Sequence, residues 1–213
     1  MIYTNEIGAF GYAVALTVYA LLTILLLSGW RRPGKSRLPA LATGISLVWA
    51  GVWTAGFLDI TRSYALVTVV EWARGFAWLA ATVVILREVT ETSLVQRLRS
   101  WYGIFAILLA AVPVGYFVFF VDHPRTTVAW FAGGYVLSLL IILVAEQLYR
   151  NASADSSSGD TYLCIAVAGV FLFDLVVYAL VIAGVSVGSE YWASRGFVIA
   201  MLAVPLVLGT RRR

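Results

Sequence analysis

Three ionisable residues lie inside long apolar stretches of this sequence, where a charged side chain is costly. Glu71 and Arg74 lie within residues 64–86, and Asp174 lies within residues 162–185. An ionised side chain near the middle of a bilayer costs about 2.5–3.5 kcal/mol on insertion scales, so such side chains normally face the protein interior and have partners. Glu71 and Arg74 are three residues apart and therefore share one helical face. We predict an ion pair between Arg74 and Asp174, with Glu71 beside it.

Three roles are compatible with these buried charges. They can form a neutral structural pin that fixes the register of the helices, or they can line a polar pocket for a small molecule or a lipid head group. They can also belong to a proton or ion path, but such a path usually shows several polar positions along one helix or paired broken helices. The sequence has neither pattern. Both the pin and the pocket fit it.

Aromatic residues and one further arginine occur at a similar depth and complete the candidate site. Aromatic side chains at helical spacing more often serve packing than ligand binding, but these could line a pocket beside the charges. They are Trp49, Trp53, Trp78 and Tyr178. Arg195 stands about one turn from the start of the apolar stretch 192–209. Its side chain either snorkels to the water outside the membrane or turns inward toward Glu71.

Apolar stretches long enough to cross a bilayer occupy most of the 213 residues. A membrane-spanning helix needs about 20 mainly apolar residues. With 62% hydrophobic residues, 12% charged residues and a mean hydropathy of +0.91, the chain has nothing left for a separate aqueous core. We predict an all-α, polytopic membrane protein, a single domain over residues 1–213 that is a bundle of seven transmembrane helices. The predicted helices are 8–28, 38–58, 64–86, 101–120, 127–148, 162–185 and 192–209.

The distribution of basic residues predicts the orientation of this bundle. Most of the 15 Lys and Arg residues follow the first, third, fifth and seventh predicted helices. Loops rich in Lys and Arg stay in the cytoplasm. We therefore expect the N-terminus outside and the C-terminus in the cytoplasm.

Several kinds of chemistry lack the residues that they need. The only lysine, Lys35, falls in a predicted loop, so no retinal Schiff base can form within the membrane. The only histidine, His123, lies in a short predicted loop with no cluster of metal ligands and no hydrolase motif around it. The single cysteine, Cys164, cannot form an internal disulfide. The basic residues sit in short loops, which leaves no surface for nucleic acid. We expect no cofactor, no metal and no nucleic-acid partner.

Four stretches of the sequence carry a family resemblance. They are Glu71–Leu79 (EWARGFAWL), Glu146–Asn151 (EQLYRN), Phe171–Tyr178 (FLFDLVVY) and Tyr191–Phe197 (YWASRGF). In these stretches the chain resembles the membrane-embedded N-terminal sensor region of PrsK-type histidine kinases, which occur in bacteria with the exosortase/PEP-CTERM protein-sorting system. The similarity is good over about residues 130–213, whereas the first, second and fourth predicted helices share mostly hydrophobicity with the family.

The resemblance implies a two-component signalling function. In that family a GAF-like domain and a histidine kinase core follow the membrane region on the cytoplasmic side. This chain stops at Arg213, without a cytoplasmic phosphoacceptor histidine or glycine-rich ATP-binding boxes. We therefore expect the sensor region alone, not an enzyme.

Such a sensor region would sit in the lipid bilayer of the bacterial inner membrane, as a homodimer in the full-length protein. We expect it to pass a ligand, lipid or envelope signal to the cytoplasmic GAF and kinase domains. The stimulus would be an unknown small molecule or lipid. The alternative is a small seven-helix transporter or channel that uses Glu71 and Asp174 as coupling groups.

Overall fold

Helices account for all regular secondary structure in the part of the chain that the structure describes. The computed structural model describes residues 2–28, 37–60, 63–89, 125–151, 158–203 and 205. The helices are α1 (Ile2–Ser28), α2 (Leu38–Phe57), α3 (Tyr64–Val89), α5 (Arg125–Asn151), α6 (Ser158–Ile182) and α7 (Ser189–Leu202). The all-α prediction is confirmed for these residues. The predicted helix 101–120 lies outside them, as do most of the segments whose charges predict the orientation.

Five of the described helices are long and apolar enough to cross a membrane. Their candidate spans are Asn5–Ser28, Leu38–Phe57, Ala65–Arg87, Val128–Asn151 and Thr161–Ile182. The described part of α7 has 14 residues, or about 21 Å at a rise of 1.5 Å per residue. Helices of this length and composition mark the chain as a multi-pass membrane protein.

The helix ends differ from the predicted ones by a few residues. α1 begins at Ile2 instead of residue 8, α6 begins at Ser158 instead of residue 162, and α7 begins at Ser189 instead of residue 192. Hydropathy marks only the apolar part of a helix, whereas the backbone hydrogen bonds continue into polar residues at its end. The C-terminal end of the predicted helix 192–209 extends beyond the described residues.

Two helices end in the same left-handed turn. Gly184, after α6, has a φ of 77°, and Val185 N donates to Leu180 O at 3.0 Å. Asp59, after α2, has a φ of 59°, and Ile60 N donates to Ala55 O at 2.9 Å. These are Schellman-type ends, in which a residue with positive φ lets the next amide reach back over the last turn.

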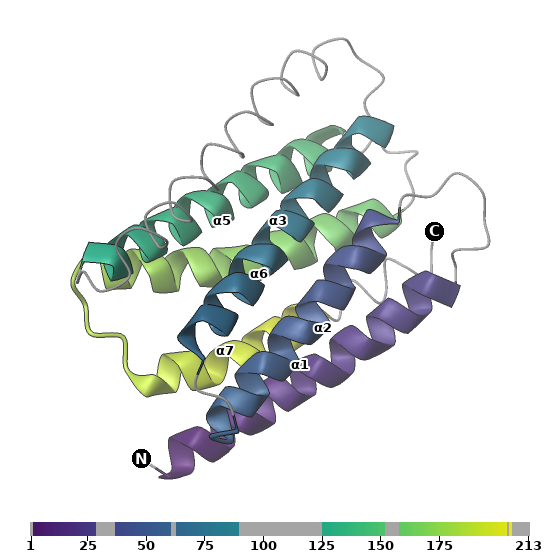
Figure 1. The fold of residues 1–213 in the computed structure, drawn as a ribbon. Coiled ribbons are helices and arrows are strands. Elements are labelled where there is room, and N and C mark those ends of the chain that lie inside the picture. Colours follow the sequence, from purple (N-terminus) through teal and green to yellow (C-terminus); the bar gives the residue numbers. More distant parts are fainter. Residues whose placement is uncertain are drawn as a thin grey trace.

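The described helices form a closed ring. α1 packs against α2, α2 against α3, α3 against α5, α5 against α6, α6 against α7, and α7 returns to α1. In Figure 1, α1 lies beside α2 while α5 and α6 form a second pair on the other side of α3. Side chains that point inward from α2, α3, α6 and α7 therefore meet in the middle of the ring.

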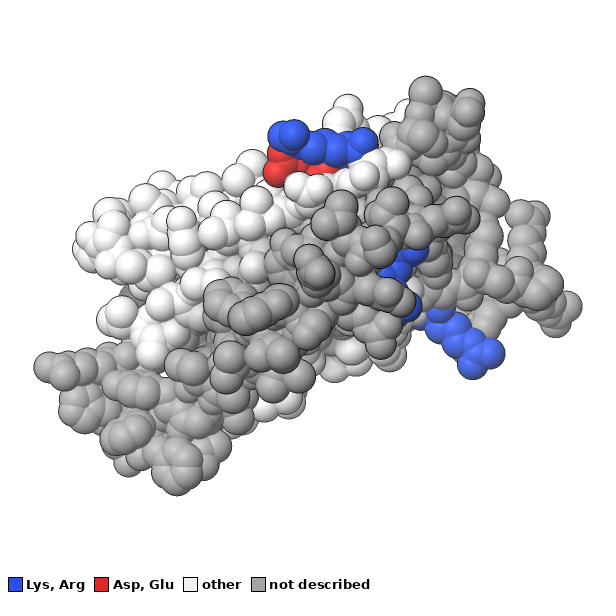
Figure 2. Space-filling model, turned by 90° about the horizontal axis from the view of Figure 1, so that it is seen from above, with Lys and Arg blue, Asp and Glu red and all other residues white. Residues whose placement is uncertain are grey.

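The outer surface of the ring is apolar. Large hydrophobic side chains such as Phe10, Val69 and Met201 are 63%, 62% and 72% exposed. The face drawn in Figure 2 carries wide uncharged areas and few charged side chains among the described residues. A soluble protein rarely exposes so much contiguous apolar surface. Contact with lipid explains this surface, and it leaves the polar side chains to the interior of the ring.

Candidate functional site

Four charged side chains from three helices meet inside the ring. Glu71 and Arg74 come from α3, Asp174 from α6 and Arg195 from α7. We call them the charge quartet. Their exposures are 6%, 1%, 0% and 0%. Two carboxylates and two guanidinium groups balance, so the quartet has no net charge when all four are ionised.

Arg195 turns inward instead of snorkelling. Its Nε donates to Asp174 Oδ1 at 2.7 Å, and its Nη2 and Nη1 donate to Glu71 Oε1 and Oε2 at 2.5 and 3.1 Å. Of the two orientations that the sequence allowed, the structure has the one toward Glu71. Both carboxylates hold this guanidinium, and together they tie α7 to α3 and to α6.

The predicted ion pair between Arg74 and Asp174 is present. Arg74 Nη2 donates to Asp174 Oδ2, and it also lies 3.1 Å from Glu71 Oε1, one turn away on the same helix. Each carboxylate therefore contacts both arginines. Charges of opposite sign alternate around the quartet, which is the arrangement that best offsets the cost of removing four charges from water.

Neutral donors complete the hydrogen bonding of Glu71. Trp49 Nε1 and Trp53 Nε1, both on α2, donate to Glu71 Oε2 at 2.6 and 3.2 Å. Tyr178 OH donates to Glu71 Oε1 at 3.3 Å and accepts from Arg195 Nη2 at 3.2 Å. Glu71 thus joins α2, α6 and α7 to its own helix. Asp174 makes fewer contacts than Glu71. Its described ionic partners are Arg74 and Arg195.

Aromatic rings cover the arginines of the quartet. The guanidinium carbon of Arg74 lies 4.3 Å from the ring centroid of Trp49 and 5.1 Å from that of Phe171. The guanidinium carbon of Arg195 lies 5.2 Å from Trp49 and 5.7 Å from Trp192. These distances allow cation–π attraction, which is strongest where water is excluded.

Trp78, another predicted site residue, lies apart from the quartet. Its Nε1 donates to Ser46 Oγ at 2.9 Å, a contact between α3 and α2 one turn along α3 from Arg74. Ser46 in turn donates to Ala42 O at 2.8 Å. The ring of Trp78 belongs to the apolar core of the bundle. Its spacing of four from Arg74 placed it on the same helical face, but not at the same depth.

Tyr12 and Trp192 are among the aromatic residues of the site that sequence reasoning missed. Tyr12 of α1 is fully buried and stacks on Trp53, with ring centroids 5.4 Å apart and planes at 10°. Trp192 of α7 also stacks on Trp53, with ring centroids 6.0 Å apart and planes at 7°. The spacing of three between Trp192 and Arg195 was the available signal. Tyr12 gives no such signal, because no charged residue neighbours it on its own helix.

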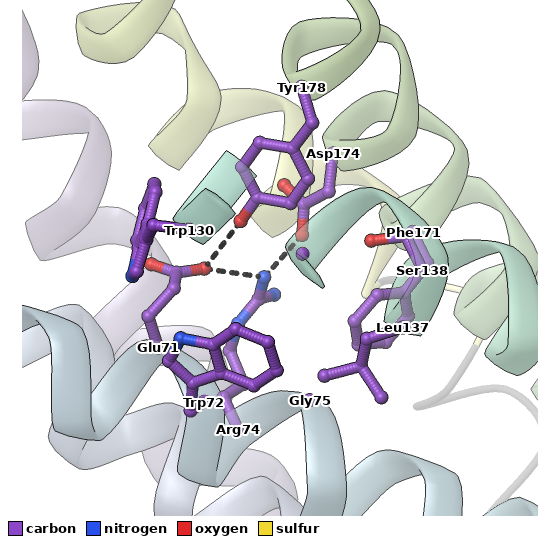
Figure 3. A pocket seen from close by; sticks show the side chains of 11 residues that line it. Glu71, Trp72, Arg74, Gly75, Trp130, Leu137, Ser138, Phe171, Asp174 and Tyr178 are labelled. Carbon is purple, nitrogen blue, oxygen red and sulfur yellow. Dashed lines mark hydrogen bonds and ion pairs between the residues drawn. The ribbon is translucent and has the colours of Figure 1, made fainter. Parts of the chain in front are cut away.

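A small pocket opens beside the quartet, between α3, α5 and α6 (Figure 3). Four predicted site residues line it: Glu71, Arg74, Asp174 and Tyr178. Trp72, Gly75, Trp130, Gly134, Leu137, Ser138 and Phe171 complete the lining. The empty space, mouth included, is ≈310 Å³, but the room for the centre of a water molecule is only ≈20 Å³. About one water molecule fills such a volume, and a drug-sized ligand needs several hundred Å³.

The contacts within the quartet suit recognition and the holding of helices. The arginines stay charged, and both carboxylates are occupied by them, so the quartet presents neither a free base nor an activated nucleophile. Among the described residues, no three His, Cys, Asp or Glu side chains gather as metal ligands do. What the quartet can do is hold four helices in one register and change that register if partners are exchanged.

Comparison of the chain with protein-family models, with curated proteins and with solved structures finds no match. The function is therefore inferred from the geometry of the site and from the residues that build it.

Proposed function

We propose that this chain is the membrane-embedded sensor domain of a two-component histidine kinase. It would span a bacterial inner membrane with seven helices, the N-terminus outside and the C-terminus in the cytoplasm. One observation carries the proposal: Arg195 of α7 is bonded to Glu71 of α3 and Asp174 of α6 inside the ring of helices. The last helix in the described part of the chain is thus positioned by internal charges.

Such an arrangement suits a helix that transmits a signal. A directional ionic contact has discrete alternatives, because each carboxylate can pair with one arginine, with the other or with both. A ligand or lipid that changes these pairings would move α7 relative to α3 and α6. Sensing requires two states whose balance the stimulus shifts, and the quartet supplies a physical basis for two states.

The family resemblance supports the same function. All four residues of the quartet lie in the stretches that carry it: Glu71 and Arg74 in Glu71–Leu79, Asp174 in Phe171–Tyr178, and Arg195 in Tyr191–Phe197. Three of the four stretches that resemble PrsK-type kinases therefore contain residues of the quartet. This proposal includes cytoplasmic GAF and kinase domains, and a homodimer of the full-length protein.

Autophosphorylation tests the proposal in the kinase that carries this domain. In membrane vesicles, the native kinase should change its rate of autophosphorylation between two conditions to which the cell responds. Replacing the domain with an unrelated membrane anchor should remove the change, and Asp174→Asn should leave the kinase fixed at one rate. If the anchor version responds like the native kinase, the domain is not the sensor. A gene that continues beyond Arg213 into kinase sequence is the simplest supporting observation.

The transporter alternative is tested in liposomes. A coupling carboxylate must bind and release its ion, whereas Glu71 and Asp174 each contact two arginines. This pairing favours the sensor. Specific solute or proton flux through the reconstituted chain, abolished by Asp174→Asn, would reverse that preference.

A further inference from the structure

The pocket beside the quartet contains hydrogen-bond donors that no described contact uses. Nε and Nη1 of Arg74 and Nε1 of Trp130 are buried and have no hydrogen-bond partner. Both side chains line the pocket between α3, α5 and α6. Buried donors are nearly always paired with protein or with an ordered molecule. Three unpaired donors around one cavity point to an occupant of that cavity.

Arg74 lines the pocket and keeps donors that no described contact uses. Its side chain is 1% exposed, and the rings of Trp49 and Phe171 both pack against the guanidinium group. Its Nη2 is occupied by Glu71 and Asp174. In Figure 3, the guanidinium group and Ser138 lie on facing sides of the same space, with Phe171 and Leu137 below. Nε and Nη1 lie on different edges of the guanidinium group, so one acceptor in the pocket can bond to one of them.

The chemistry of the donors defines the occupant. Arginine and the indole N–H can only donate, so the occupant must accept hydrogen bonds. The quartet is already neutral, and an anion or cation would therefore add an uncompensated charge in a low-dielectric interior. The occupant must be uncharged.

The size and lining of the pocket narrow the choice further. Room of ≈20 Å³ admits a single water molecule or the oxygen-bearing end of a larger molecule. The rest of the lining includes the apolar side chains of Trp72, Leu137 and Phe171. An apolar molecule dissolved in the membrane could place one carbonyl oxygen at the donors and its hydrocarbon part against these side chains.

We infer that this pocket binds an uncharged molecule through one acceptor oxygen, which Arg74 and Trp130 hold by hydrogen bonds. The oxygen comes from a water molecule or from the carbonyl group of a membrane-soluble compound. The inference rests on the proposed sensor function, since it names the class of ligand that the same site takes. Binding is measured on the chain alone, without a kinase. The ligand inference and the proposed sensor function can therefore fail independently of each other.

The first measurement uses 2-decanone labelled with ¹³C at its carbonyl, titrated into the chain in lipid nanodiscs, with empty nanodiscs as the blank. A carbonyl that accepts from Arg74 and Trp130 should give a separate, saturable ¹³C signal. Trp130→Phe keeps the ring and removes the donor, so it should weaken binding by about ten-fold, the effect of one hydrogen bond. Trp72→Phe is the matched control, because the indole nitrogen of Trp72 is not among the buried unpaired atoms.

The second measurement tests for water in the unliganded chain. Magnetisation transfer from water to the indole proton of Trp130 should be observed if a water molecule occupies the pocket. Saturable ketone binding that depends on Trp130 assigns the oxygen to a membrane-soluble carbonyl. Water transfer without ketone binding assigns it to water. If the ketone does not bind, or binds equally well to Trp130→Phe, and no water reaches Trp130, the inference is wrong.

Discussion

Two levels of the same helices are held together by different forces. At one level, α3 and α6 are joined by the charge quartet, in which each carboxylate binds two arginines. The other level lies eleven residues beyond Arg74 on α3, or about 16 Å farther along the helix. There Ile85 packs with Leu148 of α5 and Cys164 of α6 in a purely apolar cluster. Both levels are buried, yet only the first has directional contacts.

The difference shows which of the two levels can fix the positions of the helices relative to one another. Apolar contacts are non-directional, and inside a membrane apolar side chains gain little hydrophobic free energy over contact with lipid. Ionic hydrogen bonds are satisfied only in particular positions, and leaving one of them unpaired is costly. The quartet therefore specifies how α7 sits against α3 and α6, whereas the apolar cluster fills space.

Removing one charge of the quartet should have the largest effect. Asp174→Ala leaves two arginines with one carboxylate, and breaking a buried pair in this way costs about 3–5 kcal/mol in soluble proteins. The double variant Arg74→Met with Asp174→Leu leaves the neutral pair of Arg195 and Glu71, so it should lose less stability. Reversible unfolding in mixed micelles, followed by circular dichroism, measures both. A double variant less stable than Asp174→Ala would contradict the account of the quartet.

A substitution that keeps the charge but removes its geometry should have the next largest effect. Arg195→Lys cannot bind Glu71 with two nitrogens and Asp174 with a third, and we expect a loss of about 1–3 kcal/mol. The control is Arg150→Lys, because Arg150 pairs with Glu146 at the surface, where the two side chains are 69% and 44% exposed. Exposed pairs contribute about 0–1 kcal/mol. Equal losses in the same unfolding assay would show that burial of Arg195 is immaterial.

The contact between α1 and α7 should be sensitive to a single methyl group. A Cβ at Gly196 would lie 2.6 Å from the backbone atoms Gly11 C and Tyr12 N, so the two helices would have to separate. We expect Gly196→Ala to cost about 1–3 kcal/mol. At Gly44 the nearest atom, Thr23 Cγ2, is 3.9 Å away, and alanine there should be neutral or mildly stabilising. Thermal unfolding of the two variants compares them, and similar midpoints would rule out a tight crossing.

The smallest effect should come from the apolar level. Ile85→Val removes one methylene group from the cluster with Leu148 and Cys164, and such changes cost about 0.5–1.5 kcal/mol. Since no described residue of α7 belongs to this cluster, the variant should leave the position of α7 unchanged. Crosslinking between cysteines placed on α6 and α7 measures this position. A crosslinking pattern altered by Ile85→Val, as strongly as by Asp174→Ala, would remove the distinction between the two levels.

The core of the candidate site was predictable from the sequence because charges in apolar helices need partners. This rule led to the pair of Arg74 and Asp174 and to Glu71 beside it. It could not decide between snorkelling and an inward turn for Arg195, because both satisfy the charge. It also could not find Tyr12, which enters from α1 through stacking contacts alone. Helix existence followed from hydropathy, but helix ends depend on local hydrogen bonds, such as those around Asp59.

The central claim is that the quartet positions α7, and a distance measurement tests it directly. In a Cys164→Ala background, spin labels at Met201→Cys and Val69→Cys report on α7 against α3, and labels at Val48→Cys and Val69→Cys report on α2 against α3. All three labelled positions are exposed. Pulsed EPR should show that Asp174→Asn broadens the first distribution or shifts it by an amount on the order of 2 Å, the size of helix shifts in signalling proteins. The second distribution should stay the same. If Asp174→Asn leaves the distance between α7 and α3 unchanged, the quartet does not position α7.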